Sequence, residues 1–139
     1  MVHLTFTSAF NSFHKMRNNN IADGDNIQIF GKCANPSGHG HRYQIEITLG
    51  GYVTREHPFV APRSLLIRLN DRILAPKFDH KDIGASFGPD FISSGENIAK
   101  AVWQLVQPEL NDKVELLAVK IIETRKNSFV YLGPLHDQT

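Results

Sequence analysis

The sequence has little cysteine, no long apolar run and almost no net charge, and each shortage excludes a class of protein. A single cysteine among 139 residues excludes a disulfide within the chain and a zinc site built on several cysteines. No apolar run approaches the roughly 18 residues of a membrane-spanning helix. A net charge of +1 lacks the excess of lysine and arginine that neutralises phosphates. We therefore expect neither a membrane nor a nucleic acid as partner.

The rest of the composition is typical of one ordinary domain. Apolar residues make up 41% of the chain and charged residues 21%, as in soluble globular proteins. A chain of this length suits a single domain, residues 1–139, that folds without a disulfide or structural metal. The mixed polar and apolar N-terminus does not resemble a signal peptide. Together with the lone cysteine, it favours a cytoplasmic location.

Two stretches near the N-terminus alternate between apolar and polar residues with the period of a strand. In residues 2–10, one face carries Val2, Leu4, Phe6 and Phe10. In residues 39–49, one face carries His39, His41, Tyr43, Ile45, Ile47 and Leu49. The polar stretch 17–26 between them predicts a loop.

Prolines mark two helices in the second half of the chain. Pro62 begins a helix with apolar residues at helical spacing, and we expect Pro76 to end it. A second helix begins near Ser93, where Ser93 and Glu96 fit a capping box, and ends at Pro108.

The sequence predicts two more strands, at residues 116–123 and 128–132. For residues 52–59 it leaves two alternatives open, a third helix or an extra hairpin. The order strand, strand, helix, helix, strand, strand keeps the two kinds of element apart. It favours an α+β fold with an antiparallel sheet and helices packed on one face.

Three of the seven histidines are candidates for a metal site. His39 and His41 lie two residues apart on a predicted strand, so their side chains share a face. His14 has the parity of Phe10 and would lie on the apolar face if the first strand continues to it. Three histidines leave a tetrahedral position free, as in catalytic zinc sites. The alternative is that they are hydrogen-bonded core residues.

Four further residues carry candidate chemistry. Asp79 beside His80 either orients the imidazole or forms a turn. Cys33, in the loop before the histidine strand, is either a thiolate or a small buried residue. Glu123 continues the parity of Leu117, Val119 and Ile121, and an acid on an apolar face requires a partner unless it reaches water at the strand end.

Taken together, these residues resemble the 6-pyruvoyl-tetrahydropterin synthase family over nearly the whole chain. The matching segments, in order, are Phe10–His14, Ile29–Tyr43, Phe78–Lys81, Ser94–Asn97 and Lys120–Thr124. The most specific part is the sequence FGKCANPSGHGH at 30–41. The resemblance implies a four-stranded antiparallel sheet with two helices on one side. It also implies subunits that join edge to edge into a barrel with a central tunnel, and two stacked trimers in a homohexamer.

The resemblance also implies roles for the candidate residues. His14, His39 and His41 would bind Zn²⁺. Cys33 would be the catalytic base, with Asp79 and His80 completing the proton-transfer set from a neighbouring subunit. Glu123 would anchor the amino-pyrimidine edge of a pterin, helped by Glu96 and Ser94.

The activity implied is that of a zinc-dependent lyase. It would convert 7,8-dihydroneopterin triphosphate to 6-pyruvoyl-tetrahydropterin with release of triphosphate. The alternatives are the 6-carboxy-tetrahydropterin synthase of the queuosine pathway and a relative that binds metal or pterin without catalysis. The five residues between Cys33 and His39 favour the pyruvoyl enzyme. Three departures from the family pattern are Phe13, Gly95 and the segment Phe59–Pro62.

Overall fold

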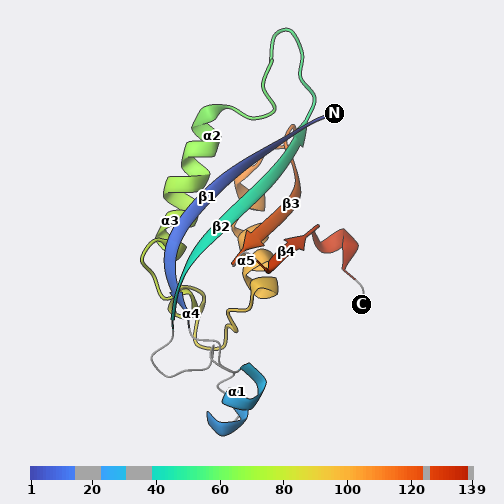
Figure 1. The fold of residues 1–139 in the computed structure, drawn as a ribbon. Coiled ribbons are helices and arrows are strands. Elements are labelled where there is room, and N and C mark those ends of the chain that lie inside the picture. Colours follow the sequence, from blue (N-terminus) through green and yellow to red (C-terminus); the bar gives the residue numbers. More distant parts are fainter. Residues whose placement is uncertain (15–22, 31–38, 124–125, 138–139) are drawn as a thin grey trace.

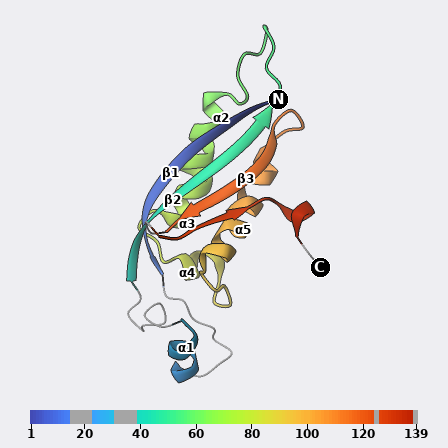
Figure 2. The same cartoon turned by 45° about the vertical axis from the view of Figure 1, so that its right-hand side comes forward.

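The computed structural model describes residues 1–14, 23–30, 39–123 and 126–137. Its strands are β1 (Val2–His14), β2 (His39–Gly51), β3 (Glu115–Ile122) and β4 (Ser128–Tyr131). They form one antiparallel sheet in the order β1-β2-β3-β4 (Figures 1 and 2). The predicted four-stranded α+β fold is confirmed, and β1 continues to His14 as the metal-site hypothesis requires.

The register of the sheet explains which residues face the core. β1 and β2 pair without interruption from Val2 opposite Gly51 to His14 opposite His39. Between β2 and β3 the register shifts at Thr48/Leu49, which is a β-bulge. The core position opposite Leu49 belongs to Leu116, which is buried. The predicted alternation starting at Leu117 is therefore wrong at that residue, although Val119 and Ile121 are buried as expected.

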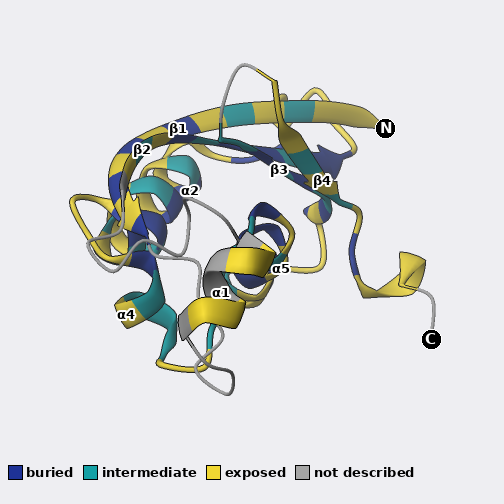
Figure 3. Cartoon of the chain, turned by 60° about the horizontal axis from the view of Figure 1, so that its bottom comes forward, coloured by how far each residue is buried: buried dark blue, intermediate teal, exposed yellow. Residues whose placement is uncertain are grey.

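The helices lie on one face of the sheet (Figure 1). They are α2 (Arg63–Arg68), a π-helical turn (Leu69–Leu74), α3 (Ala75–Phe78) and α5 (Gly95–Val106). Figure 3 shows that buried residues gather between the sheet and these helices. The expectation that Pro76 ends the first helix is wrong. The wide π-helical turn places Pro76 at the start of α3, where its missing N–H breaks no helical hydrogen bond.

Several short elements were not predicted. α1 (Asp23–Phe30) begins inside the stretch 17–26 expected to be a loop, so that prediction is wrong for its last residues; residues 15–22 lie outside the described part. Asp25 falls in the first turn of α1, where the helix dipole favours an acid. α4 (Ile83–Phe87) is a single turn capped by Asp82. Two 3₁₀ turns follow, at Gln107–Glu109 and Pro134–His136.

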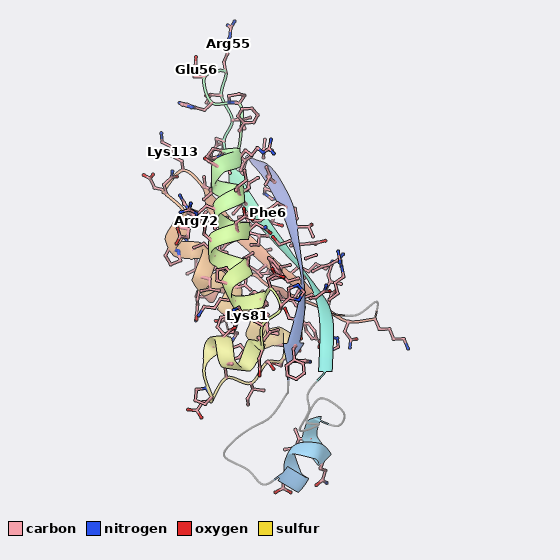
Figure 4. The ribbon with its side chains drawn as sticks, turned by 90° about the vertical axis from the view of Figure 1, so that its left-hand side faces the viewer. Phe6, Arg55, Glu56, Arg72, Lys81 and Lys113 are labelled. Atoms are coloured by element: carbon pink, nitrogen blue, oxygen red, sulfur yellow. The ribbon has the colours of Figure 1, made fainter. Side chains whose placement is uncertain are left out.

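The loop at 52–59 contains neither a helix nor a strand. It projects beyond the end of the sheet, with Arg55 and Glu56 near its tip (Figure 4). Among the described residues, no helix is long and apolar enough to cross a membrane. The expected cytoplasmic location stays a prediction.

Candidate metal and catalytic site

Three strands bring a candidate metal site together at one end of the sheet. His14 is the last residue of β1, His41 lies on β2, and Glu123 directly follows β3. The ligand atoms of these three side chains lie within 4.8 Å of one another. We call this group the His–Glu cluster. It forms because residues of equal parity on neighbouring antiparallel strands share one face.

The geometry of the His–Glu cluster is compact. Glu123 Oε1 lies 3.4 Å from His41 Nε2 and 3.6 Å from His14 Nε2. The two imidazole rings are 4.8 Å apart at 65°. Tyr43 contacts both rings edge to face, at 5.9 Å from His14 and 5.6 Å from His41. His14 is fully buried, while the side chains of His41 and Glu123 keep 18% and 13% of their surface exposed.

Ser93 orients the ring of His14. Nδ1 of His14 lies 3.2 Å from the Ser93 carbonyl oxygen and 3.2 Å from its hydroxyl. A carbonyl only accepts, so this contact assigns the proton of a neutral His14 to Nδ1. The lone pair of Nε2 then faces the cluster. An outer partner of this kind is typical of metal-binding histidines, and Ser93 was missed in the sequence because only its capping role was visible there.

The electrostatics of the cluster favour a bound positive charge. Burial raises the pKa of Glu123, and the negative charge of Glu96 raises it further. The lone pair on Nε2 of His14 and the negative carboxylate of Glu123 point toward each other at 3.6 Å. Such a pair is stable only when a proton or a cation lies between them. Two imidazoles and one carboxylate are a donor set that suits zinc. The residues present therefore fit a metal ion.

Two of the predicted residues lie where the structure says little or nothing. The backbone of His39 pairs with His14 at the end of the β1–β2 ladder, but the side chain of His39 lies outside the described part. Cys33 lies entirely outside the described residues. The predicted ligand role of His39 and the predicted base role of Cys33 stay predictions.

Asp79 and His80 lie beside the site without joining the cluster. The His80 N–H donates to the Asn11 carbonyl, and the Phe13 N–H donates to the Lys81 carbonyl. The segment 79–82 thus runs along the outer edge of β1. Asp79 Oδ1 lies 3.6 Å from His80 Nε2, and both side chains are exposed, His80 by 77%. His80 has a left-handed backbone (φ 54°), which is uncommon for a residue with a side chain and presents its imidazole to solvent.

The first turn of α5 places Ser94 and Glu96 at the same end of the sheet. Ser94, not Ser93, caps the helix, since its hydroxyl accepts from the Asn97 N–H at 3.3 Å. The predicted capping box is therefore wrong by one residue, and Ser93 is left for His14. Glu96 is exposed and acts on Glu123 through its charge.

The departures from the family pattern fall in different places. Phe13 pairs with Gly40 in the β1–β2 register and points away from the face that carries His14. Phe59, Val60 and Pro62 line a cavity of about 520 Å³ at the opposite end of the sheet, near Gly50–Gly51. Neither departure changes the His–Glu cluster.

The fold and the site together define a class of protein. A four-stranded antiparallel sheet, covered by helices on one face, gathers two histidines and a glutamate at its end in an arrangement that could hold a metal ion.

Comparison with known proteins agrees with this class. The family model for 6-pyruvoyl tetrahydropterin synthase matches residues 3–134. The chain is 32% identical over 133 residues to the Drosophila melanogaster 6-pyruvoyl tetrahydrobiopterin synthase, covering 94% of this chain and 79% of that protein. It is 32% identical over 127 residues to the Homo sapiens protein of the same name, covering 90% and 87%. The structure of the Caenorhabditis elegans 6-pyruvoyl tetrahydropterin synthase matches with a TM-score of 0.86 at 28% identity, covering 95% of each chain. The chain belongs to the 6-pyruvoyl tetrahydropterin synthase family.

Proposed function

We propose that the protein is a zinc-dependent lyase that converts 7,8-dihydroneopterin triphosphate to 6-pyruvoyl-tetrahydropterin and triphosphate. The observation that carries the proposal is the His–Glu cluster at the sheet end of a chain that belongs to this family. In this reaction the side-chain carbons are oxidised while the pterin ring is reduced, so no external redox cofactor is needed.

Two members of the His–Glu cluster, His14 and His41, are proposed as zinc ligands together with His39, and the third member, Glu123, is assigned to the substrate beside the metal. Bound there, zinc would act as a Lewis acid on the hydroxyl oxygens of the substrate side chain. Ser93 supports the role of His14, because its carbonyl keeps the proton on Nδ1 and the lone pair on Nε2. The chemistry of the donors supports the set, since neutral imidazoles leave the metal its positive charge.

Glu123 is the proposed anchor for the pterin ring. A carboxylate accepts two parallel hydrogen bonds from an amino-pyrimidine edge. Its partial burial supports this role, because water competes poorly for a carboxylate that is only 13% exposed. Glu96 and Ser94 assist from the first turn of α5. The Ser94 hydroxyl already accepts from the Asn97 N–H, so it has its proton left to donate to a ligand.

Proton transfer is assigned to Cys33, Asp79 and His80. Cys33 as a thiolate would remove and return protons at the side-chain carbons, and Asp79 would orient His80 for the remaining transfers. The exposure of Asp79 and His80 supports a role in the site of a neighbouring subunit. Within one chain they point to solvent rather than into the His–Glu cluster.

The sheet edges support an assembly of this kind. In the described part of the chain, β1 and β4 are the two outer strands of the sheet. Residues 80–82 cover β1 only near Asn11 and Phe13. Exposed edges invite pairing with another chain. We propose that subunits join β1 to β4 into a barrel, as a trimer, and that two trimers stack into a homohexamer.

One experiment tests the reaction. The purified protein is assayed for bound zinc, then incubated with 7,8-dihydroneopterin triphosphate, and both phosphate and pterin products are analysed. We expect stoichiometric zinc, released triphosphate and 6-pyruvoyl-tetrahydropterin. A zinc-loaded protein that releases no triphosphate refutes the lyase proposal. A carboxy-pterin formed together with acetaldehyde identifies the carboxy-tetrahydropterin synthase instead.

A further inference from the structure

Gly95, the first residue of α5, packs directly against an aromatic ring of β4. A Cβ atom placed on Gly95 would lie only 2.1 Å from Cδ2 and 2.2 Å from Cε2 of Phe129. Real Cβ atoms do not approach carbon so closely, and the ring is not the free end of a flexible chain. Gly95 is buried. The ring of Phe129 therefore fills the space that a side chain at position 95 would need, and only glycine fits there.

This contact lies next to the His–Glu cluster. Phe129 is opposite Ile121 in the β3–β4 register, and Glu123 follows two residues later on the same face of β3. On the helix side, Gly95 comes one residue after Ser94 and two after Ser93, whose carbonyl contacts His14. The contact between Phe129 and Gly95 thus joins β4 to the start of α5, two elements that pack against each other (Figure 1).

Two further hydrogen bonds of this segment act only within it. The Ser94 hydroxyl accepts from the Asn97 N–H, and the Asn97 side-chain amide donates to the Ile92 carbonyl at 2.9 Å. Both bonds join residues of the segment 92–97 to one another and so shape the turn. The contact between Gly95 and Phe129 instead joins this turn to the sheet, on which the cluster is built.

We propose that Phe129 is a positioning residue for the metal centre, acting through Gly95 and Ser93 on the ring of His14. The ring sets how closely the first turn of α5 approaches the sheet, and this distance sets where the Ser93 carbonyl meets Nδ1 of His14. Gly95 and Phe129 therefore form a size-matched pair, in which enlarging one residue requires reducing the other. The expected effect on zinc binding rests on the proposed function. The contact between Phe129 and Gly95 and its effect on the ring of His14 do not depend on a metal.

The test compares Gly95→Ala, Phe129→Val and the double variant in the full-length protein. Zinc affinity is measured by competition with a chromophoric chelator, and the site geometry by the visible spectrum of bound Co²⁺. Side-chain ¹⁵N signals of His14 are recorded on metal-free protein labelled at histidine. Gly50→Ala is the control for a new methyl group far from the site. A Cβ there would lie 2.8 Å from Leu117 Cδ1, the free end of a flexible side chain, at the far end of the sheet.

We expect Gly95→Ala to weaken zinc binding at least tenfold, to alter the Co²⁺ spectrum and to shift the His14 signals. The double variant should recover wild-type affinity to within about threefold, because the smaller valine leaves room for the new methyl group. Gly50→Ala should leave all three measurements unchanged.

Three outcomes overturn the inference. The first is a folded Gly95→Ala protein with unchanged His14 signals. The second is a folded double variant that remains as impaired as Gly95→Ala. The third is an equal effect of Gly50→Ala. If the wild-type protein binds no zinc, the proposed function fails separately, and the metal-free His14 signals of the same variants still decide the role of Phe129.

Discussion

We expect the replacement of Glu123 by glutamine to stabilise the metal-free protein and to weaken the binding of zinc. The substitution keeps the shape of the side chain and removes its charge. In the metal-free protein, burial and the charge of Glu96 raise the pKa of Glu123. A raised carboxyl pKa means that the folded protein binds more protons than the unfolded chain between the two pKa values. Stability therefore falls as pH rises from about 4.5, the ordinary value, through the raised value. The Glu123→Gln variant does not have this loss.

The size of the effect follows from the exposure of the side chain. A buried polar group without full compensation costs on the order of 1–3 kcal/mol, and a fully buried charge costs more. We take the lower end, about 1 kcal/mol, because 13% of the Glu123 side chain is exposed. For 139 residues, the entropy of unfolding is about 0.3 kcal/mol per degree. The metal-free variant should therefore melt about 3 °C above the wild type at pH 8. Toward pH 5 the gain should shrink, because the raised pKa of Glu123 lets the carboxylate take up its proton as the pH falls.

In the presence of zinc, the same substitution should have an unfavourable effect. The carboxylate lies beside the proposed ligands, 3.4 Å from His41 Nε2, so its charge attracts a bound cation. We expect zinc affinity to fall about tenfold in Glu123→Gln, in the range seen when groups around a metal are removed.

Scanning calorimetry with a chelator or with zinc, at pH 5 and pH 8, measures both effects. Glu96→Gln is the control. It removes only the charge that acts on Glu123 from a distance, so the melting temperature should change in the same direction but by less. A metal-free Glu123→Gln protein that melts below the wild type at pH 8 refutes the reasoning.

Other predictions concern the metal, the base, the helix cap and the core. Zinc at 100 times its dissociation constant should add about 2.7 kcal/mol of stability, or about 9 °C in Tm, and no shift would contradict a folded metal site. Cys33→Ala should keep zinc and lose turnover, and normal turnover would exclude Cys33 as the base. Ser94→Ala should cost about 1 kcal/mol in urea denaturation because the cap of α5 is lost. Ile98→Ala, at a fully buried position, should cost about 2–5 kcal/mol, whereas the exposed Ile67→Ala should cost far less.

Period-2 alternation was enough to place much of the site. It predicted that His14 and His41 share a face, and it put Glu123 on the same face of a third strand. Both predictions depend only on the alternation of side chains along a strand, and in the structure the three side chains lie together, while the roles assigned to them stay predictions. The bulge at Thr48/Leu49 removed Leu117 from the pattern but left the later residues in phase.

Contacts between distant segments could not be read in the same way. Ser93 looked like a helix cap because local spacing favours Ser–x–x–Glu, yet the helix starts one residue later and Ser93 meets a strand 79 positions away. Gly95 looked only like a departure from the family pattern, because nothing in the local sequence indicates that Phe129 occupies its space. Pro76 looked like a stop signal, because the π-helical turn before it has no simple sequence signature.

The His–Glu cluster also constrains the order of folding. Its residues come from β1, β2 and the end of β3, and the group that orients His14 precedes α5. Contacts between such distant segments form only after large loops have closed, which makes them slow. No hairpin or helix of this chain can assemble the cluster alone. The β1–β2 pair carries all three proposed zinc ligands, whereas Glu123 and Ser93 come from later segments. Zinc should therefore bind weakly once β1 and β2 have paired and reach its full affinity only in the last kinetic phase, so that zinc affinity reports completion of the domain.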